Sequence, residues 1–307
     1  MNNYVSFAPH IKSGDSTNRM YIVLICSLIP ALLVGLIFFG FLSIFTVLIC
    51  VLSVVASEIA FNFYKYKKFM FNDYSTILVG VLIGMTMPPK APILYPVLGA
   101  VLSNILVKNC MGGSGKSVVS EVAFAKVVTF IAFSSIAECY VGVFGGVQTA
   151  QTLLDTIISG AELEQNIFQL IIGFGTGAIG EMAVLFVLAG GVFACIMKII
   201  DYKVPVIYLV TILLMSFVCF GTIEAFQLLM AGGVVLCAFY LLTDFACMPK
   251  TLLGKVVYSV IAGVITVLYW KFGKNPNLGA FYAVLIVGIV ANAIKGFYRP
   301  RIVGEKR

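Results

Sequence analysis

The sequence predicts an all-α integral membrane protein with about ten transmembrane helices. Of its 307 residues, 61% are hydrophobic and 11% are charged, a balance far more apolar than that of soluble domains. Apolar runs of about 20 residues, each able to cross a hydrocarbon core of ~30 Å, follow one another along the chain. Basic residues gather in alternate connections between these runs, which indicates the direction of each crossing.

The apolar runs divide the chain into spans that we expect to form one transmembrane domain over residues 1–307. The first run is interpreted as a retained span, because no small-residue cleavage site follows it and a second run begins at once. The expected spans are 20–40, 42–63, 75–88, 93–107, 121–139, 181–200, 204–221, 225–243, 252–270 and 278–296.

The distribution of basic residues orients these spans. With the N-terminus in the cytoplasm, seventeen of the twenty Lys and Arg residues fall on the cytoplasmic side, and only Lys90, Lys271 and Lys274 fall outside. Between Lys126 and Lys198 the chain has no Lys or Arg, although it holds several acidic residues. We therefore expect both termini in the cytoplasm and the polar segment at about 140–170 on the outer side.

Two similar motifs suggest an inverted repeat of five spans in each half. Met87-Pro88-Pro89-Lys90 resembles Met248-Pro249-Lys250, and the two Pro-Lys pairs are 160 residues apart. Because five is odd, the two halves would have opposite orientations in the membrane, and such repeats place their site at the interface between them. Gly and Pro are common in membrane helices in any case, so the pattern alone leaves the repeat open.

Several other features favour structural interpretations. Gly115-Lys116-Ser117 resembles the end of a nucleotide-binding P-loop, but Cys110 stands where that motif needs Gly. The eight cysteines include no Cys-x-x-Cys pair, so we expect neither a disulfide framework nor a thiolate cluster. The single histidine, His10, lies on a polar arm and receives no role. The net charge of +7 fits cytoplasmic loops beside anionic lipids and requires no nucleic-acid partner.

Three acidic residues lie within or at the ends of expected spans and are candidates for an ion pathway. They are Glu58, Glu181 and Asp244. Ionisable groups in the membrane are costly and therefore functional candidates, although each could also lie close enough to an interface to be hydrated. Glu181 follows a glycine-rich run in which Gly177 and Gly180 are candidate cofactor contacts, because glycine lets the backbone approach a ligand and a helix N-terminus favours an anion.

Motifs spread over nearly the whole chain resemble those of the RnfD and NqrB proteins. The chain lacks the long N-terminal extension typical of NqrB, so RnfD is the better match. The matching motifs include Ala8-Pro9-His10-Ile11, Met87-Pro88-Pro89, Gly112-Gly113-Ser114-Gly115-Lys116, Gly177-Ala178-Ile179-Gly180-Glu181 and Thr243-Asp244.

The resemblance implies a membrane subunit of a complex that couples electron transfer between ferredoxin and NAD to the pumping of Na⁺ or H⁺. It also implies flavin mononucleotide (FMN) attached through its phosphate to a Thr hydroxyl, in an outer motif that reads Ser-Gly-Ala-Thr-Pro-Leu. Residues 149–154 resemble that motif, with Thr149 at the Ser and Thr152 at the acceptor Thr. Ala150, Gln151 and Leu153 depart from it, so a scaffold subunit without flavin stays open as an alternative.

The resemblance further implies an inner (cytoplasmic) cell-membrane location and contacts with the other membrane and peripheral subunits of such a complex. Ferredoxin and NAD would act through those subunits. The sequence leaves open a second, non-covalent flavin and the choice between Na⁺ and H⁺. It also leaves open a non-redox channel or a secondary transporter of small polar solutes, because a ten-span inverted repeat serves several functions.

Overall fold

The structure is a computed structural model dominated by helices. It describes residues 16–67, 74–113, 115–133, 140–142, 148–149, 152–160, 172–173 and 175–297. His10 and much of the expected outer segment, including 161–171, lie outside these residues.

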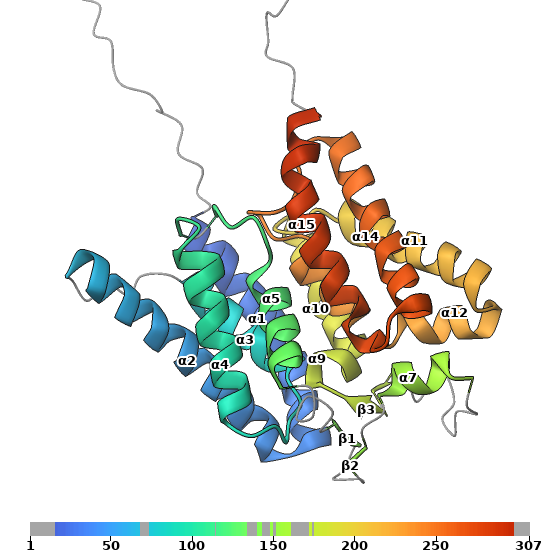
Figure 1. Cartoon of the computed structure of the whole chain (residues 1–307), viewed down its shortest axis with the longest axis horizontal. Coiled ribbons are helices and arrows are strands. Elements are labelled where there is room, and N and C mark those ends of the chain that lie inside the picture. Colours follow the sequence, from blue (N-terminus) through green and yellow to red (C-terminus); the bar gives the residue numbers. More distant parts are fainter. Residues whose placement is uncertain are drawn as a thin grey trace, which may run out of the picture.

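Two groups of helices form the body of the protein (Figure 1). The first group contains α1 (Thr17–Phe39), α2 (Phe41–Tyr66), α3 (Tyr74–Thr86), α4 (Leu94–Ser103), the π-helix η1 (Asn104–Asn109) and α5 (Glu121–Ala132). The second contains α9 (Ile179–Met182), α10 (Val184–Ile196), α11 (Lys203–Cys219), α12 (Thr222–Leu229), α13 (Val234–Leu236), the π-helix η3 (Cys237–Leu241), α14 (Leu252–Phe272), the 3₁₀ helix η4 (Pro276–Leu278) and α15 (Gly279–Phe297).

Caps and glycines set the ends of these helices. Ser16 caps α1 by accepting a hydrogen bond from the backbone N–H of Arg19. Gly40 ends α1 with a φ of +73°, a conformation that only glycine adopts without strain, and α2 starts at the next residue. Thr251 caps α14 in the same way as Ser16 caps α1. The apolar runs are therefore cut into helices at the positions where polar or glycine residues interrupt them.

Among the described residues, four helices are long and apolar enough to cross a membrane alone, namely α1, α2, α14 and the continuous η4–α15. The pair α12 and α13–η3, bent by 60°, makes a fifth if it is counted as one broken span. The shorter apolar helices α3, α10 and α11 fall on expected spans but are below the length of a full crossing. The protein is thus a multi-pass membrane protein, while the ten-span count stays a prediction.

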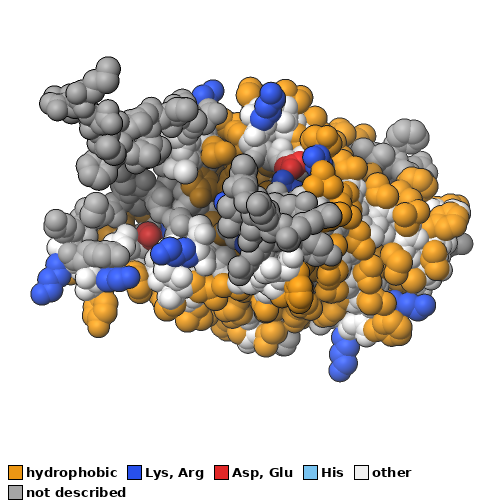
Figure 2. All heavy atoms as spheres, turned by 90° about the horizontal axis from the view of Figure 1, so that it is seen from above, with side chains coloured by type: hydrophobic (Ala, Val, Ile, Leu, Met, Phe, Trp, Pro, Cys, Tyr) orange, Lys and Arg blue, Asp and Glu red, His pale blue; other side chains and the backbone are white. Residues whose placement is uncertain are grey.

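The two groups pack side by side, with α1 against α10 and α5 against α15. The start of α1 and the end of α15 lie at one end of the body, and the small sheet and the short helix α7 (Leu153–Ile158) lie at the other (Figure 1). Figure 2 looks onto the end where α1 begins, and shows hydrophobic side chains over the flanks with Lys and Arg side chains at this end and its rim. The cytoplasmic location of both termini stays a prediction.

A small antiparallel sheet interrupts the otherwise helical fold, which the all-α prediction does not include. Its strands are β1 (Tyr140–Gly142), β2 (Gln148–Thr149) and β3 (Thr176–Gly177), in the order β2–β1–β3. Tyr140 pairs with Thr149, and Val141 pairs with both Gln148 and Gly177. Strands of two or three residues are too short to produce a recognisable alternation in the sequence.

Two lysines that were expected to be cytoplasmic loop charges are buried in the helical body. Lys108 lies in η1 and is 1% exposed, and Lys126 lies in α5 and is fully buried. Both lysines bond to groups inside the body, so neither is a solvated loop charge, and the side of the membrane on which they lie stays a prediction. Without these two lysines, fifteen basic residues fall on the predicted cytoplasmic side and three on the outer side, so the predicted orientation is unchanged.

The predicted orientation is tested by labelling an introduced cysteine. Ser159, exposed at the end of the short helix α7 (Leu153–Ile158), is replaced by Cys after five native cysteines are replaced by Ser: the exposed Cys26 and Cys110, the partly exposed Cys195 and Cys219, and Cys139. A membrane-impermeant maleimide should label Ser159→Cys from the outer side of intact cells. This segment contains no Lys or Arg, the residues that keep a loop in the cytoplasm.

The matched control is Lys116→Cys, an exposed position in the connection between η1 and α5. It should be labelled only in inverted membrane vesicles. Labelling of Ser159→Cys in inverted vesicles alone would reverse the topology and remove the outer-side assignment of the polar segment.

Candidate functional site

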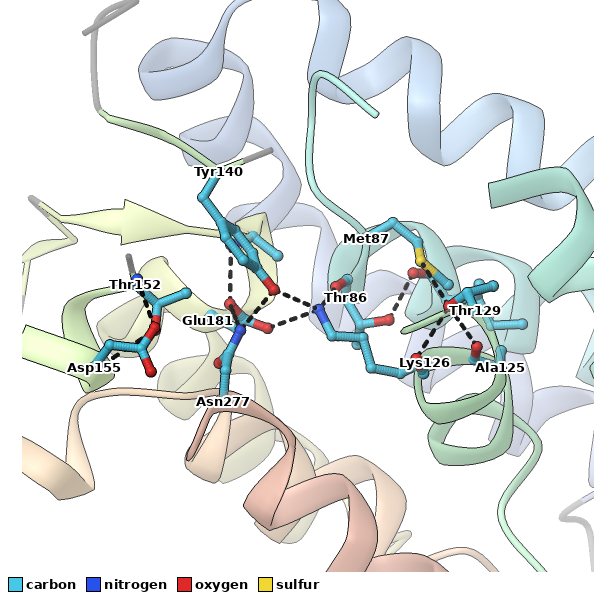
Figure 3. A network of polar contacts seen from close by, with 12 residues as sticks. Thr86, Met87, Ala125, Lys126, Thr129, Tyr140, Thr152, Asp155, Glu181 and Asn277 are labelled. Atoms are coloured by element: carbon cyan, nitrogen blue, oxygen red, sulfur yellow. Dashed lines mark hydrogen bonds and ion pairs between the residues drawn. The ribbon is translucent and has the colours of Figure 1, made fainter. Parts of the chain in front are cut away.

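A buried ion pair lies where the two groups of helices meet the small sheet (Figure 3). Lys126 Nζ lies 3.2 Å from Glu181 Oε1, and the two residues are 0% and 1% exposed. The ammonium also donates to the carbonyl oxygen of Thr86, the last residue of α3, and lies 3.5 Å from Tyr140 Oη. An ammonium has three N–H groups, so each can find an oxygen partner.

The second oxygen of Glu181 is bonded as well. Its Oε2 accepts hydrogen bonds from the backbone N–H of Ala178 (3.1 Å) and from Asn277 Nδ2 (3.4 Å). Asn277 Nδ2 also donates to Tyr140 Oη at 2.7 Å. A carboxylate that is paired with a cation and accepts further hydrogen bonds is stabilised in its charged form, which compensates for its burial.

Thr152 lies beside this network and caps the short helix α7. Its Oγ1 donates to Asp155 Oδ2 at 2.7 Å, and its backbone N–H donates to the same oxygen at 2.9 Å. The backbone N–H of Asp155 points back to Thr152 Oγ1 at 3.4 Å, which completes a capping box. The hydroxyl of Thr152 is therefore engaged, and the residue is only 3% exposed.

The small sheet and α7 connect Thr152 to the ion pair. Thr149 on β2 pairs with Tyr140 on β1, whose phenol belongs to the network around Glu181. Leu154 on α7 packs against the break between α12 and α13, since a Cβ at Gly232 would lie 2.3 Å from Leu154 Cδ1. The structure thus brings the predicted residues Thr149, Thr152 and Glu181 into one region, although they come from separate elements.

Gly177 and Gly180 have packing roles in this region. A Cβ at Gly177 would lie 2.9 Å from Met182 Cε and 3.2 Å from Glu181 Oε2. A Cβ at Gly180 would lie 2.4 Å from Leu236 Cδ1 and 3.2 Å from the carbonyl oxygen of Met85. These glycines allow α9 to approach α3 and α13 closely, so packing alone explains them, and their predicted contact with a cofactor stays a prediction.

The structure does not bring the three predicted acids together. Glu58 on α2 is buried and lies 3.6 Å from Lys108 Nζ, and that ammonium also donates to Thr76 Oγ1 at 2.7 Å. Within the part of the chain that the structure describes, Glu58 Oε2 accepts no hydrogen bond. Glu58 and Glu181 therefore each share a buried ion pair with a lysine that no sequence pattern assigned to them.

Asp244 lies apart from both ion pairs and lines a cavity. The cavity has a volume of about 780 Å³, including the solvent space at its mouth. Ser75 on α3, Glu121 on α5 and Tyr240 on η3 also line it. Asp244 is half-buried and accepts a hydrogen bond from the backbone N–H of Ala246.

Lys126, Tyr140 and Asn277 are the site residues that sequence reasoning missed. A signal existed for Lys126, because it lies inside the expected span 121–139 and an ionisable residue there is a functional candidate. No local signal distinguishes Tyr140 or Asn277, which reach Glu181 only through the tertiary fold. Among the described residues no group of three or more His, Cys, Asp or Glu side chains is arranged to hold a metal.

Comparison with known proteins gives matches over the full length. A family model described as the NQR2, RnfD, RnfE family matches residues 4–304. The chain is 30% identical to a subunit of the Na⁺-translocating ferredoxin:NAD⁺ oxidoreductase complex of Acetobacterium woodii, over 99% of this chain and 96% of that protein. It is 24% identical to a subunit of the proton-translocating ferredoxin:NAD⁺ oxidoreductase complex of Clostridium ljungdahlii, over 99% and 96%.

A further relative is a subunit of the ion-translocating oxidoreductase complex of Escherichia fergusonii, with 25% identity over 99% of both chains. The matches run from one end of the chain to the other, as do the motifs that resemble RnfD. They confirm the resemblance, and the chain belongs to the NQR2, RnfD, RnfE family.

Proposed function

We propose that this chain is the RnfD component of an Rnf-type complex, which couples electron transfer between ferredoxin and NAD⁺ to the translocation of Na⁺ or H⁺. The observation that carries the proposal is the end-to-end match to subunits of such complexes, including 30% identity over 99% of the chain. A channel or solute transporter is the weaker alternative, because these relatives are named as oxidoreductase subunits.

In this proposal the chain crosses the cytoplasmic membrane ten times, as two inverted halves of five helices, with both termini in the cytoplasm. Its partners are the other membrane and peripheral subunits of the complex, through which ferredoxin and NAD⁺ act. The charge asymmetry of the loops and the position of the small sheet and α7 opposite the start of α1 and the end of α15 support this arrangement.

We further propose that Thr152 carries FMN through a phosphoester. Bound FMN would supply the electron acceptance and donation, and the protein would supply attachment and orientation. Thr152 offers the hydroxyl that a phosphate ester needs, at the N-cap of α7. Its hydroxyl is held by Asp155, so attachment requires the capping box to open. Thr149, Gly177 and Gly180 lie in the same region and would flank the flavin.

The attachment is tested by the intact mass of the protein purified from its native host. The wild-type chain should be heavier than its sequence by one FMN less one water. Thr152→Ala should lose this mass completely, because an ester needs a hydroxyl, whereas Thr152→Ser should retain part of it. Thr149→Ala should reduce the attached fraction or leave it unchanged, because Thr149 offers at most a supporting contact.

Thr156→Ala is the matched control, since its hydroxyl lies on the same helix and bonds the carbonyl oxygen of Leu153. It should keep the full flavin mass. A wild-type chain without added mass would favour a scaffold subunit, and loss of the mass in Thr156→Ala but not in Thr152→Ala would move the attachment site.

We also propose that Glu58, Glu181 and Asp244 contribute to the ion pathway. Their place in or beside the membrane body supports this role. Charged groups there reduce stability, so they are found mainly where they serve a function. The two glutamates are already compensated by Lys108 and Lys126. A passing cation would therefore have to compete with an ammonium at each of them, whereas Asp244 faces a cavity.

Neutral substitutions of these acids separate coupling from assembly. Asp244→Asn should lower ion uptake into vesicles relative to electron transfer, with the complex still assembled. Glu58→Gln and Glu181→Gln should lower uptake and also reduce stability, since breaking a buried ion pair costs about 3–5 kcal/mol. Uptake per electron transferred is the quantity to measure, and unchanged ratios in all three variants would exclude the acids from the pathway.

The same cavity is our candidate position for a second, non-covalent flavin. Its lining mixes apolar side chains with the polar groups of Ser75, Glu121 and Asp244, the combination found in small-molecule sites. Flavin released from the Thr152→Ala variant by denaturation would support this second site. A variant that releases none would leave FMN at Thr152 as the only flavin.

A further inference from the structure

The side chain of Lys126 has the surroundings of a bound cation rather than those of a surface lysine. Its Nζ contacts three oxygens from three separate elements, namely Thr86 O from α3, Tyr140 Oη from β1 and Glu181 Oε1 from α9. The ring centroids of Tyr140 and Phe281 each lie 5.6 Å from the same nitrogen. Carbonyl, phenol and carboxylate oxygens around one fully buried positive charge form the ligand set of a desolvated monovalent cation.

The end of α3 beside this nitrogen favours a positive charge. Thr86 ends α3, and the carbonyl end of a helix carries a partial negative charge. Glu181 lies against the start of α13, where a Cβ at Gly233 would be 3.3 Å from Glu181 Cγ. Membrane transporters use the ends of interrupted helices in this way to hold cations and anions near the membrane centre.

The site also contains an acceptor that the ammonium does not use. Asn277 is 5% exposed, and its Nδ2 bonds both Tyr140 Oη and Glu181 Oε2. Its Oδ1 has no hydrogen-bond partner among the described residues. A buried acceptor without a partner is costly. The amide that carries it contacts two of the groups that form the cation's surroundings.

We propose that Lys126 is a built-in cation that fills a monovalent-cation site formed by Thr86 O, Tyr140 Oη, Glu181 and Asn277. Free Na⁺ can enter this site only when the ammonium is absent or withdrawn. This assignment of the four ligands depends only on the contacts of Lys126 and Glu181 and not on the proposed function. The further step, that a translocated cation displaces the ammonium during turnover, rests on the proposed ion-translocating function.

The site is tested with the purified full-length protein in detergent, without electron transfer. Lys126→Met keeps the apolar part of the side chain and removes the charge, which leaves Glu181 uncompensated. Its unfolding temperature should fall below that of the wild type in N-methyl-D-glucamine chloride. Replacing that salt by NaCl at the same ionic strength should raise it by ~3 °C or more and saturably, since a ligand that binds the folded state stabilises it.

The wild type should show no such difference between the two salts, because its site is filled. Lys126→Met/Glu181→Gln should lose the Na⁺ response, because the carboxylate that binds the ion is gone. Lys255→Met is the matched control, since Lys255 pairs with Asp201 at a partly exposed position where water can compensate the acid. It should respond equally to both salts.

An equal response of Lys126→Met to both salts would overturn the proposal, and so would a wild type that responds to Na⁺ as strongly as the variant. If Lys126→Met cannot be purified, Lys126→Gln replaces it, because its amide can still donate to Thr86 O and Tyr140 Oη while Glu181 stays uncompensated. Its failure to respond to Na⁺ would count equally against the site. A Na⁺ response together with a chain that carries no flavin would keep the site and reject the proposed redox role.

Discussion

The compensation of buried charge is the constraint on which the centre of this protein depends. A carboxylate at Glu181 is tolerable inside the body only because an ammonium, an amide and a backbone N–H all reach it. Those partners come from α5, η4 and the residue before α9. The ammonium of Lys126 in turn needs the carbonyl end of α3. Satisfying one pair of charges therefore fixes the relative positions of segments from both helical groups.

Close packing supports this arrangement, because the two groups approach through small residues. A Cβ at Gly190 on α10 would lie 2.1 Å from the carbonyl oxygen of Ser27 on α1, so only glycine allows this approach. Beside it, Ser27 Oγ and Tyr240 Oη form a hydrogen bond of 2.9 Å between the groups. Small residues at helix interfaces and hydrogen bonds across them are the means by which membrane helices associate, since burial from lipid offers little driving force.

The small sheet gives the polar segment a direct connection to the buried charges. Tyr140 takes part both in the pairing with Thr149 and in the hydrogen bond with Asn277. A group attached at Thr152 would thus be connected to the Lys126–Glu181 pair through strands β2 and β1. Charge placed on such a group would act on the pair through a poorly screened interior, where electrostatic interactions are strong. This geometry offers a physical basis for coupling between the proposed flavin and the proposed cation site.

The sequence by itself determined the helical membrane architecture, because apolar runs, caps and loop charges act locally. It also identified Glu58, Glu181 and Asp244 as unusual acids, and its motifs identified the family. Only the tertiary structure decided how the buried acids are compensated. Lys126 lies 55 residues from Glu181, and Asn277 lies 96 residues from it, so no local pattern joins them. The sheet likewise joins strands of two or three residues, which are too short to leave a periodic signal, whereas the capping box of Thr152 and Asp155 is a local motif of the sequence.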